Sequence, residues 1–191
     1  MSLEKIKLEI KDLEKKYNRK SDDVKLIAVS KVQPQQKIKS VLDKDHKFFG
    51  ENRVQEAFQK WPKLKENYDD IELHLLGYLQ TNKVKLAFEN FQYIHTLDRT
   101  KLAKAIANEA QRKGFCPKLF IQINSGKEEQ KSGIDPEMAE NFINECINNY
   151  KLPVIGLMCL PPINEDSSIH FKYLKSLAEN CGLYHLSMGM S

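Results

Sequence analysis

Short apolar runs alternate with longer segments of helical period along almost the whole chain, and this alternation limits the folds open to it. The runs have the length of strands and are rich in aliphatic and β-branched residues. The longer segments repeat apolar residues every three or four positions, as amphipathic helices do. The predicted strands are LIAV, KFFGEN, ELHLLG, YIHTL, KLFIQIN, PVIGLMCL and YHLSMG, which begin at residues 26, 47, 72, 93, 118, 153 and 184. Regular alternation of this kind is typical of α/β folds with a parallel sheet.

We expect a (β/α)₈ barrel of the TIM type with about seven of its eight strands present. A doubly wound sheet would alternate in the same way, but the sequence has no GxGxxG after its first strand and no GxxxxGK[ST] anywhere. We expect one domain over residues 1–191, with its last βα unit missing and with unpaired edges on the first and last strands. An amphipathic helix is predicted over residues 1–18. Its apolar face carries Leu3, Ile6, Ile10, Leu13 and Tyr17.

The charges and cysteines bear on several function classes. The 30 basic and 26 acidic residues are mixed along the chain, which argues against a nucleic-acid or membrane partner. The cysteines form no CxxC pair, so neither a zinc site nor a redox motif is indicated, and we expect most of them to be buried thiols. We expect a cytoplasmic location, because the sequence shows no apolar N-terminal signal and no membrane-length apolar stretch.

Lys31 is the first candidate for chemistry. It follows the predicted buried strand Leu26–Val29, and Pro34 prevents that strand from continuing. Active residues of α/β barrels collect at the carboxyl ends of strands. A lysine there is either a solvated strand-end residue or an amine held in a pocket, where burial lowers its pKa. Such an amine binds a phosphate or forms an imine with an aldehyde. The pattern alone leaves both interpretations open.

The segment Ser187–Ser191 is a second candidate, because it places Gly189 between two serines directly after the last predicted strand. Small residues let backbone N–H groups approach a phosphate, and serine hydroxyls add donors. Short turns of serine and glycine are common, so this pattern also has an ordinary structural explanation.

Four further polar residues lie at strand ends. Asn52 either hydrogen-bonds a ring hydroxyl or caps the following helix with its side chain. Glu51 is an ion-pair partner or an acid or base. We expect His74 and His95 to be satisfied strand-end residues rather than ligands, because neither has metal-ligand spacing or a carboxylate partner in the sequence.

Several short motifs occur in an order and spacing that together are specific. They are AVSK, FGEN, LHLLGYLQTNK, HTLDR, LFIQINSGKEEQKSGI, GLMCLPP and LSMGMS. Over about residues 26–191 the chain resembles the pyridoxal phosphate homeostasis protein family, whose fold is similar to the N-terminal barrel of alanine racemase. The family continues past the LSMGMS motif with a last strand that carries an arginine and a Gly-Thr pair. The resemblance therefore implies a chain truncated at its C-terminus.

The resemblance also implies a cofactor and the residues that hold it. Lys31 would form a Schiff base with pyridoxal 5′-phosphate, and Asn52 would lie beside the cofactor ring. Lys131 matches a basic position of the family near the mouth of the barrel where these residues would lie, although a solvated loop lysine explains it equally well. The resemblance implies no catalytic residue. The cradle for the cofactor phosphate would be formed by Ser187, Met188, Gly189 and Ser191.

Four functions remain open on the sequence. The first is a non-catalytic carrier that holds pyridoxal phosphate as a Schiff base and releases it to other amines, such as those of pyridoxal-phosphate-dependent apoenzymes. The second is an amino-acid racemase, which needs a second acid or base opposite the lysine. The third is a class I aldolase. The fourth is a degenerate barrel fragment that no longer binds the cofactor. We expect a monomer, with association possible through open barrel edges.

Overall fold

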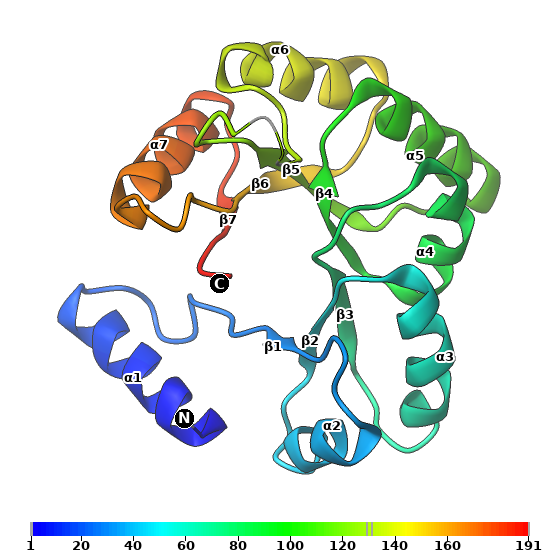
Figure 1. The fold of residues 1–191 in the computed structure, drawn as a ribbon, viewed down its shortest axis with the longest axis vertical. Coiled ribbons are helices and arrows are strands. Elements are labelled where there is room, and N and C mark those ends of the chain that lie inside the picture. Colours follow the sequence, from blue (N-terminus) through cyan, green and yellow to red (C-terminus); the bar gives the residue numbers. More distant parts are fainter. Residues whose placement is uncertain (1, 129, 131, 191) are drawn as a thin grey trace.

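Seven parallel strands form one curled sheet in a computed structural model of the chain, which describes residues 2–128, 130 and 132–190. The order of strands in the sheet follows the chain, so each strand pairs with the next one. The crossovers that connect them lie on the outer side of the sheet (Figure 1). The predicted α/β architecture with seven strands is confirmed. Within the described residues, the sheet does not pair β7 with β1, and the barrel is open between them.

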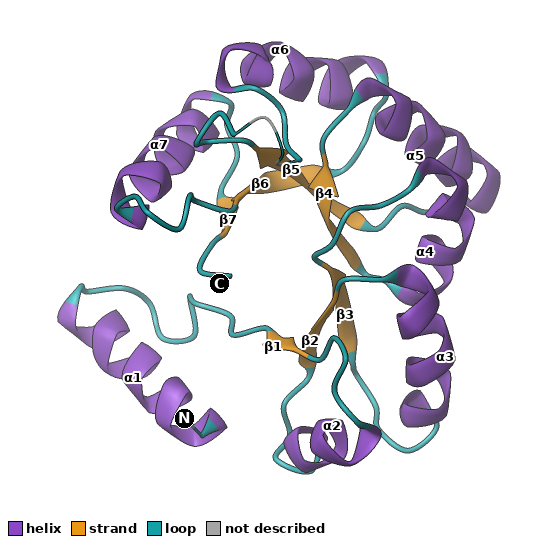
Figure 2. Cartoon of the chain, in the orientation of Figure 1, coloured by secondary structure: helices purple, strands orange, loops and turns teal. Residues whose placement is uncertain are grey.

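Each strand is short, and each of the first six is followed by a helical crossover (Figure 2). The strands are β1 (Ala28–Val29), β2 (Phe48–Glu51), β3 (Glu72–Leu75), β4 (Tyr93–Leu97), β5 (Lys118–Ile123), β6 (Val154–Cys159) and β7 (His185–Ser187). The α-helices are α1 (Leu3–Lys16), α2 (Gln35–Leu42), α3 (Val54–Lys65), α4 (Val84–Asn90), α5 (Thr100–Lys113), α6 (Ala139–Asn144) and α7 (Ser167–Asn180). The 3₁₀ turns η1 (Thr81–Lys83) and η2 (Pro136–Met138) lead into α4 and α6, and the π-helical turn η3 (Glu145–Asn149) follows α6.

The helix ends lie where the sequence places its caps. Asp135 accepts a hydrogen bond from the backbone N–H of Glu137 at 2.8 Å, with Pro136 as the first residue of η2. Gly114 ends α5 with φ +75°, in the left-handed region that a glycine enters without a steric penalty.

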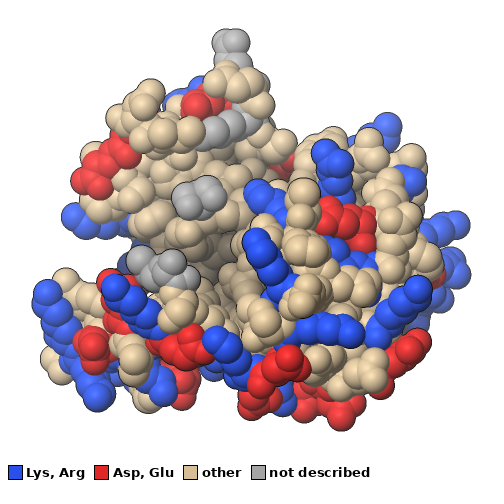
Figure 3. All heavy atoms as spheres, turned by 60° about the horizontal axis from the view of Figure 1, so that its bottom comes forward, with Lys and Arg blue, Asp and Glu red and all other residues tan. Residues whose placement is uncertain are grey.

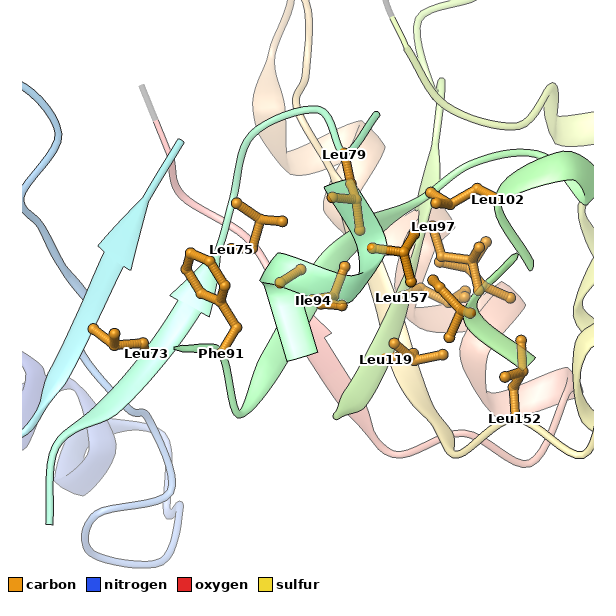
Figure 4. Close-up of a cluster of buried hydrophobic side chains, with 14 of the residues drawn as sticks. Leu73, Leu75, Leu79, Phe91, Ile94, Leu97, Leu102, Leu119, Leu152 and Leu157 are labelled. Carbon is orange, nitrogen blue, oxygen red and sulfur yellow. The ribbon is translucent and has the colours of Figure 1, made fainter. Parts of the chain in front are cut away.

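The apolar core lies between the sheet and the helices that cover its outer face (Figure 4). Alternate residues of the strands point into this layer because side chains alternate across a strand. Leu73, Leu75, Ile94, Leu119 and Leu157 are all fully buried there. The concave face of the sheet is left to the intervening residues, which include the site described below.

The first strand differs from the prediction. Only Ala28–Val29 of the predicted buried strand Leu26–Val29 pair with β2, and Val29 is 37% exposed. The expectation that this strand is covered on both faces is wrong. The reason is its edge position, because β1 has a described neighbour on one side only.

Two predicted helix faces also differ. On α1, Leu13 and Tyr17 are exposed, whereas Glu14 is buried and accepts hydrogen bonds from the backbone N–H groups of Asp22 and Val24 at 3.1 and 2.8 Å. The helix is therefore fastened to the following loop by a carboxylate rather than by its last apolar residues.

On α3, the apolar period of the sequence predicts that Phe58 faces inward, but Phe58 is 45% exposed, whereas Lys60 is buried. The apolar period of the sequence after Asp135 also predicts that Met138 points inward, but Met138 is exposed. Basic and acidic side chains are interspersed on the face shown in Figure 3, as the sequence predicts. None of the helices in the described part of the chain is long and apolar enough to cross a bilayer.

Candidate functional site

Lys31 lies in a turn directly after β1. The backbone N–H of Gln33 closes this turn on the carbonyl oxygen of Ser30 at 3.2 Å, and Val32 adopts φ +57°. The side chain of Lys31 is exposed, and its ammonium group has no hydrogen bond or ion pair with a described residue. The interpretation of Lys31 as a buried amine is therefore wrong. The lysine is a free primary amine at the carboxyl end of an edge strand.

A buried ion pair fixes the backbone on the N-terminal side of Lys31. Glu51, at the end of β2, is fully buried, and its Oε1 accepts hydrogen bonds from three donors. These are the Ser30 hydroxyl at 2.8 Å, the Lys60 ammonium at 2.8 Å and the Trp61 indole N–H at 3.0 Å. Of the two roles that the sequence leaves open for Glu51, the structure shows the ion-pair partner.

Lys60 extends the same network to the other side of Lys31. Its ammonium also donates to the carbonyl oxygen of Ser30 and to Glu56, both at 2.9 Å. Glu56 in turn accepts the backbone N–H of Val32 at 2.7 Å. Burial raises the pKa of Glu56, but the hydrogen bonds from Lys60 and Val32 together lower it by more. The net pKa of Glu56 therefore lies below its usual value. Both neighbours of Lys31 are thus tied to α3, while its side chain stays free.

Asn52 follows β2 and does not cap α3. The N-cap residue of that helix is Arg53, and no side chain bonds to its first N–H groups. The Oδ1 atom of Asn52 is buried and has no hydrogen-bond partner among the described residues. A buried polar atom without a partner costs free energy, and one at the mouth of a barrel points to a missing partner such as a ligand.

Gly77 explains how the loops after β2 and β3 can lie so close together. A Cβ atom at this position would lie 2.1 Å from the backbone oxygen of Asn52, so only glycine fits. The absence of a side chain at Gly77 therefore helps to place Asn52.

The segment after β7 presents donors. The hydroxyl of Ser187 lies 2.8 Å from Nδ1 of His95. Gly189 adopts φ +82° and faces open space. The backbone N–H groups of Met188, Gly189 and Met190 donate to no acceptor in the described part of the chain. Unused N–H groups in a turn of this kind suit an anion. The predicted residues Ser191 and Lys131 lie outside the described residues.

These candidates share one end of the sheet, because each follows the carboxyl end of a parallel strand. Lys31 and Asn52 follow the neighbouring strands β1 and β2, which pair at Val29 and Gly50. Ser187 ends the seventh strand, and in the view of Figures 1 and 2 the sheet curls so that the C-terminal segment comes round toward the segment that leads into β1. The mouth combines an amine, an unsatisfied amide and free anion donors.

The two strand histidines are connected, which the sequence analysis missed. Nδ1 of His74 lies 3.0 Å from Nε2 of His95, whose other nitrogen meets Ser187. Burial lowers the pKa of His74 to about 4 and that of His95 well below its ordinary value, with the neighbouring His74 adding to the effect at His95. His95 is satisfied at both nitrogens, as expected. His74 is not, because its Nε2 is buried without a partner among the described residues.

Other reactive groups lie apart from this mouth or are held inert. Burial raises the pKa of the Cys146 and Cys116 thiols to about 12 and that of Cys159 to about 11. Within the described residues, no three His, Cys, Asp or Glu side chains gather as metal ligands. One cavity of about 320 Å³ lies between the η2–α6 region and α7, and another of about 300 Å³ lies between α1 and the start of β1 and β2.

Comparison with known proteins identifies the family. Residues 1–188 match the family described as alanine racemase, N-terminal domain. The pyridoxal phosphate homeostasis protein of Aquifex aeolicus is 38% identical over 176 residues, which cover 87% of this chain and 76% of that protein. The chain belongs to the pyridoxal phosphate homeostasis protein family. A second relative of that name, from Haemophilus influenzae, is 36% identical over 188 residues. The match covers 93% of this chain and 79% of the length of that relative.

Solved structures agree with this family assignment. PipY of Synechococcus elongatus, solved without pyridoxal phosphate, superposes with a TM-score of 0.80 at 32% identity, covering 94% of this chain and 87% of PipY. PipY has also been solved with pyridoxal phosphate bound, and that structure gives a TM-score of 0.78. Alanine racemase of Clostridium difficile shares the fold, with a TM-score of 0.70 at 17% identity over 96% of this chain and 50% of the racemase.

Proposed function

We propose that this member of the pyridoxal phosphate homeostasis protein family binds pyridoxal 5′-phosphate through Lys31 and acts in intracellular homeostasis of that cofactor rather than in turnover. The observation that carries the proposal is the buried, unpartnered amide oxygen of Asn52 at the same mouth as the free amine of Lys31. The amide oxygen can accept a hydrogen bond from a ring hydroxyl, and the amide NH₂ group can donate to the phenolate form. The PipY structure with the cofactor bound supports the choice of ligand.

Lys31 supplies the covalent link. Lys31 would hold the cofactor, because a deprotonated primary amine condenses reversibly with an aldehyde and releases water. The reaction is reversible, which suits a carrier that releases the cofactor to another amine. The chain's own contribution is positional, because the network of Glu51, Lys60 and Glu56 holds the backbone on both sides of Lys31.

The segment after β7 holds the phosphate. The free N–H groups of Met188 and Gly189 and the hydroxyl of Ser187 provide donors without bringing in a positive charge. Ser191 belongs to the same cradle in this proposal. The proposed recipients are pyridoxal-phosphate-dependent apoenzymes. We assign no catalytic residue.

A titration of the purified chain with pyridoxal phosphate, followed by visible absorbance, tests the proposal. We expect saturable Schiff-base absorbance for the wild type and for Lys37→Ala, an exposed lysine on the neighbouring helix α2 that serves as the matched control. We expect none for Lys31→Ala. Borohydride reduction followed by peptide mapping locates the modified lysine.

Three outcomes contradict the proposal. Equal absorbance changes in wild type and Lys31→Ala would mean that the chain binds the aldehyde nonspecifically. A reducible adduct at one other defined lysine would mean that the site assignment is wrong. Interconversion of the alanine enantiomers by the loaded protein, lost in Lys31→Ala, would favour the racemase function instead.

A further inference from the structure

A chain of hydrogen bonds crosses the concave side of the sheet and ends at Ser187. It runs from His74 on β3 through His95 on β4 to Ser187 on β7, with separations of 3.0 and 2.8 Å. Ring stacking fixes the planes of both imidazoles. His74 stacks on Tyr93 and His95 on Phe120, each with 4.3 Å between ring centroids. The three polar groups therefore meet in one defined geometry.

Both rings are neutral at neutral pH, because burial lowers their pKa values. A neutral imidazole carries one N–H donor and one acceptor nitrogen. The chain therefore has two arrangements. In the first, His74 donates from Nδ1 to His95, which donates from its own Nδ1 to the oxygen of Ser187. In the second, the hydroxyl of Ser187 donates to His95, which donates from Nε2 to His74.

The two arrangements differ at both ends of the chain. The second leaves an N–H on Nε2 of His74, which is buried and has no partner among the described residues. The first leaves a lone pair there instead, and unpaired buried N–H groups are the rarer of the two in proteins. The first arrangement also leaves the hydroxyl hydrogen of Ser187 free, whereas the second turns only lone pairs toward the mouth.

We propose that the His74–His95 pair holds the Ser187 hydroxyl as a hydrogen-bond donor to the phosphate monoester of the ligand. The inference rests on the proposed function, since it takes the ligand from there. His95 is then a positioning residue that acts through Ser187 without touching the ligand. A phosphate dianion accepts hydrogen bonds only, so the Ser187 hydroxyl can donate to it only in the first arrangement.

The protonated nitrogens can be read directly in the wild-type protein. Two-bond ¹H–¹⁵N correlation spectra of uniformly ¹⁵N-labelled protein loaded with pyridoxal phosphate distinguish the two tautomers of each ring. We expect the proton on Nδ1 of both His74 and His95. Protons on Nε2 of both rings would overturn the inference, and this measurement needs no variant to fold.

Variants of His95 test the consequence for binding. His95→Phe keeps a ring against Phe120 but removes both nitrogens, and His95→Asn keeps an N–H near the position of Nδ1. We expect His95→Phe to weaken pyridoxal phosphate about tenfold, the effect of one charge-assisted hydrogen bond, and pyridoxal by less than about twofold. His95→Asn should recover most of the loss. In a Ser187→Ala background, His95→Phe should add no further loss.

The comparison of the two ligands separates this inference from the proposed function. Pyridoxal lacks the phosphate, so a merely structural role of His95 would weaken both ligands by the same factor and overturn the inference. Additive losses in the double variant would overturn it as well. Suppose that the wild type binds pyridoxal phosphate through Lys31, but that His95→Phe leaves the ratio of the affinities for pyridoxal phosphate and pyridoxal unchanged. Only the positioning role then fails. If the wild type does not bind the cofactor, both proposals fail.

Discussion

Replacing Lys60 with methionine removes the cation that faces the buried carboxylate of Glu51. The side chains of Lys60 and Glu51 are only 9% and 0% exposed, so water cannot take the place of the lost ammonium. Removing one member of a buried ion pair costs about 3–5 kcal/mol of folding free energy, because the remaining charge is left without compensation. We therefore expect Lys60→Met to lower the free energy of unfolding by about 3–5 kcal/mol. For a chain of this size, this corresponds to a melting temperature lower by about 6–20 °C.

The assay is urea denaturation followed by far-ultraviolet circular dichroism. Trp61 is the only tryptophan, but its indole bonds to Glu51, so its fluorescence would report the local change as well as unfolding. Lys63→Met is the matched control, because Lys63 lies on the same helix and is exposed. We expect it to change the unfolding free energy by less than about 0.5 kcal/mol.

A double variant completes the argument. Replacing both members of the pair, as Lys60→Met with Glu51→Leu, removes the buried charges together and should regain most of the lost stability. Equal stability of Lys60→Met and Lys63→Met would refute the reasoning, and so would a double variant less stable than Lys60→Met alone. Because the pair ties Ser30 and Val32, Lys60→Met should also weaken Schiff-base formation at Lys31.

Three further outcomes are expected. Gly77→Ala should lower the free energy of unfolding by about 1–3 kcal/mol in urea titrations, because its Cβ would meet the backbone oxygen of Asn52, and wild-type stability would refute the close approach. The pKa of His74 is about 4 in the folded protein and about 6.5 in the unfolded chain, so the unfolded chain binds more protons between these pH values and stability rises with pH there. We expect His74 to make the protein about 2 kcal/mol less stable at pH 5 than at pH 7, a difference that His74→Phe should remove and that denaturation at both pH values measures. Cys146, whose pKa burial raises to about 12, should react with a thiol reagent only after urea unfolds the chain, and rapid labelling of the native protein would contradict its burial.

The sequence determined the elements and their order. Strand and helix formation depends on local periodicity and capping, so KLFIQIN as a strand and Asp135-Pro136 as a helix start could be read directly. The joint order of the motifs was enough to recognise the family, which the comparisons confirm. Lys31, Asn52 and Ser187 were placed at strand ends for the same local reason.

Only the tertiary structure decided which polar groups meet. Lys60 looked like a surface residue of an amphipathic helix, yet it is buried because Glu51 on the adjacent strand needs a cation. His95 and Ser187 are 92 positions apart and meet because the sheet curls across its concave face. Such contacts depend on strand register and curvature, which a local pattern does not encode.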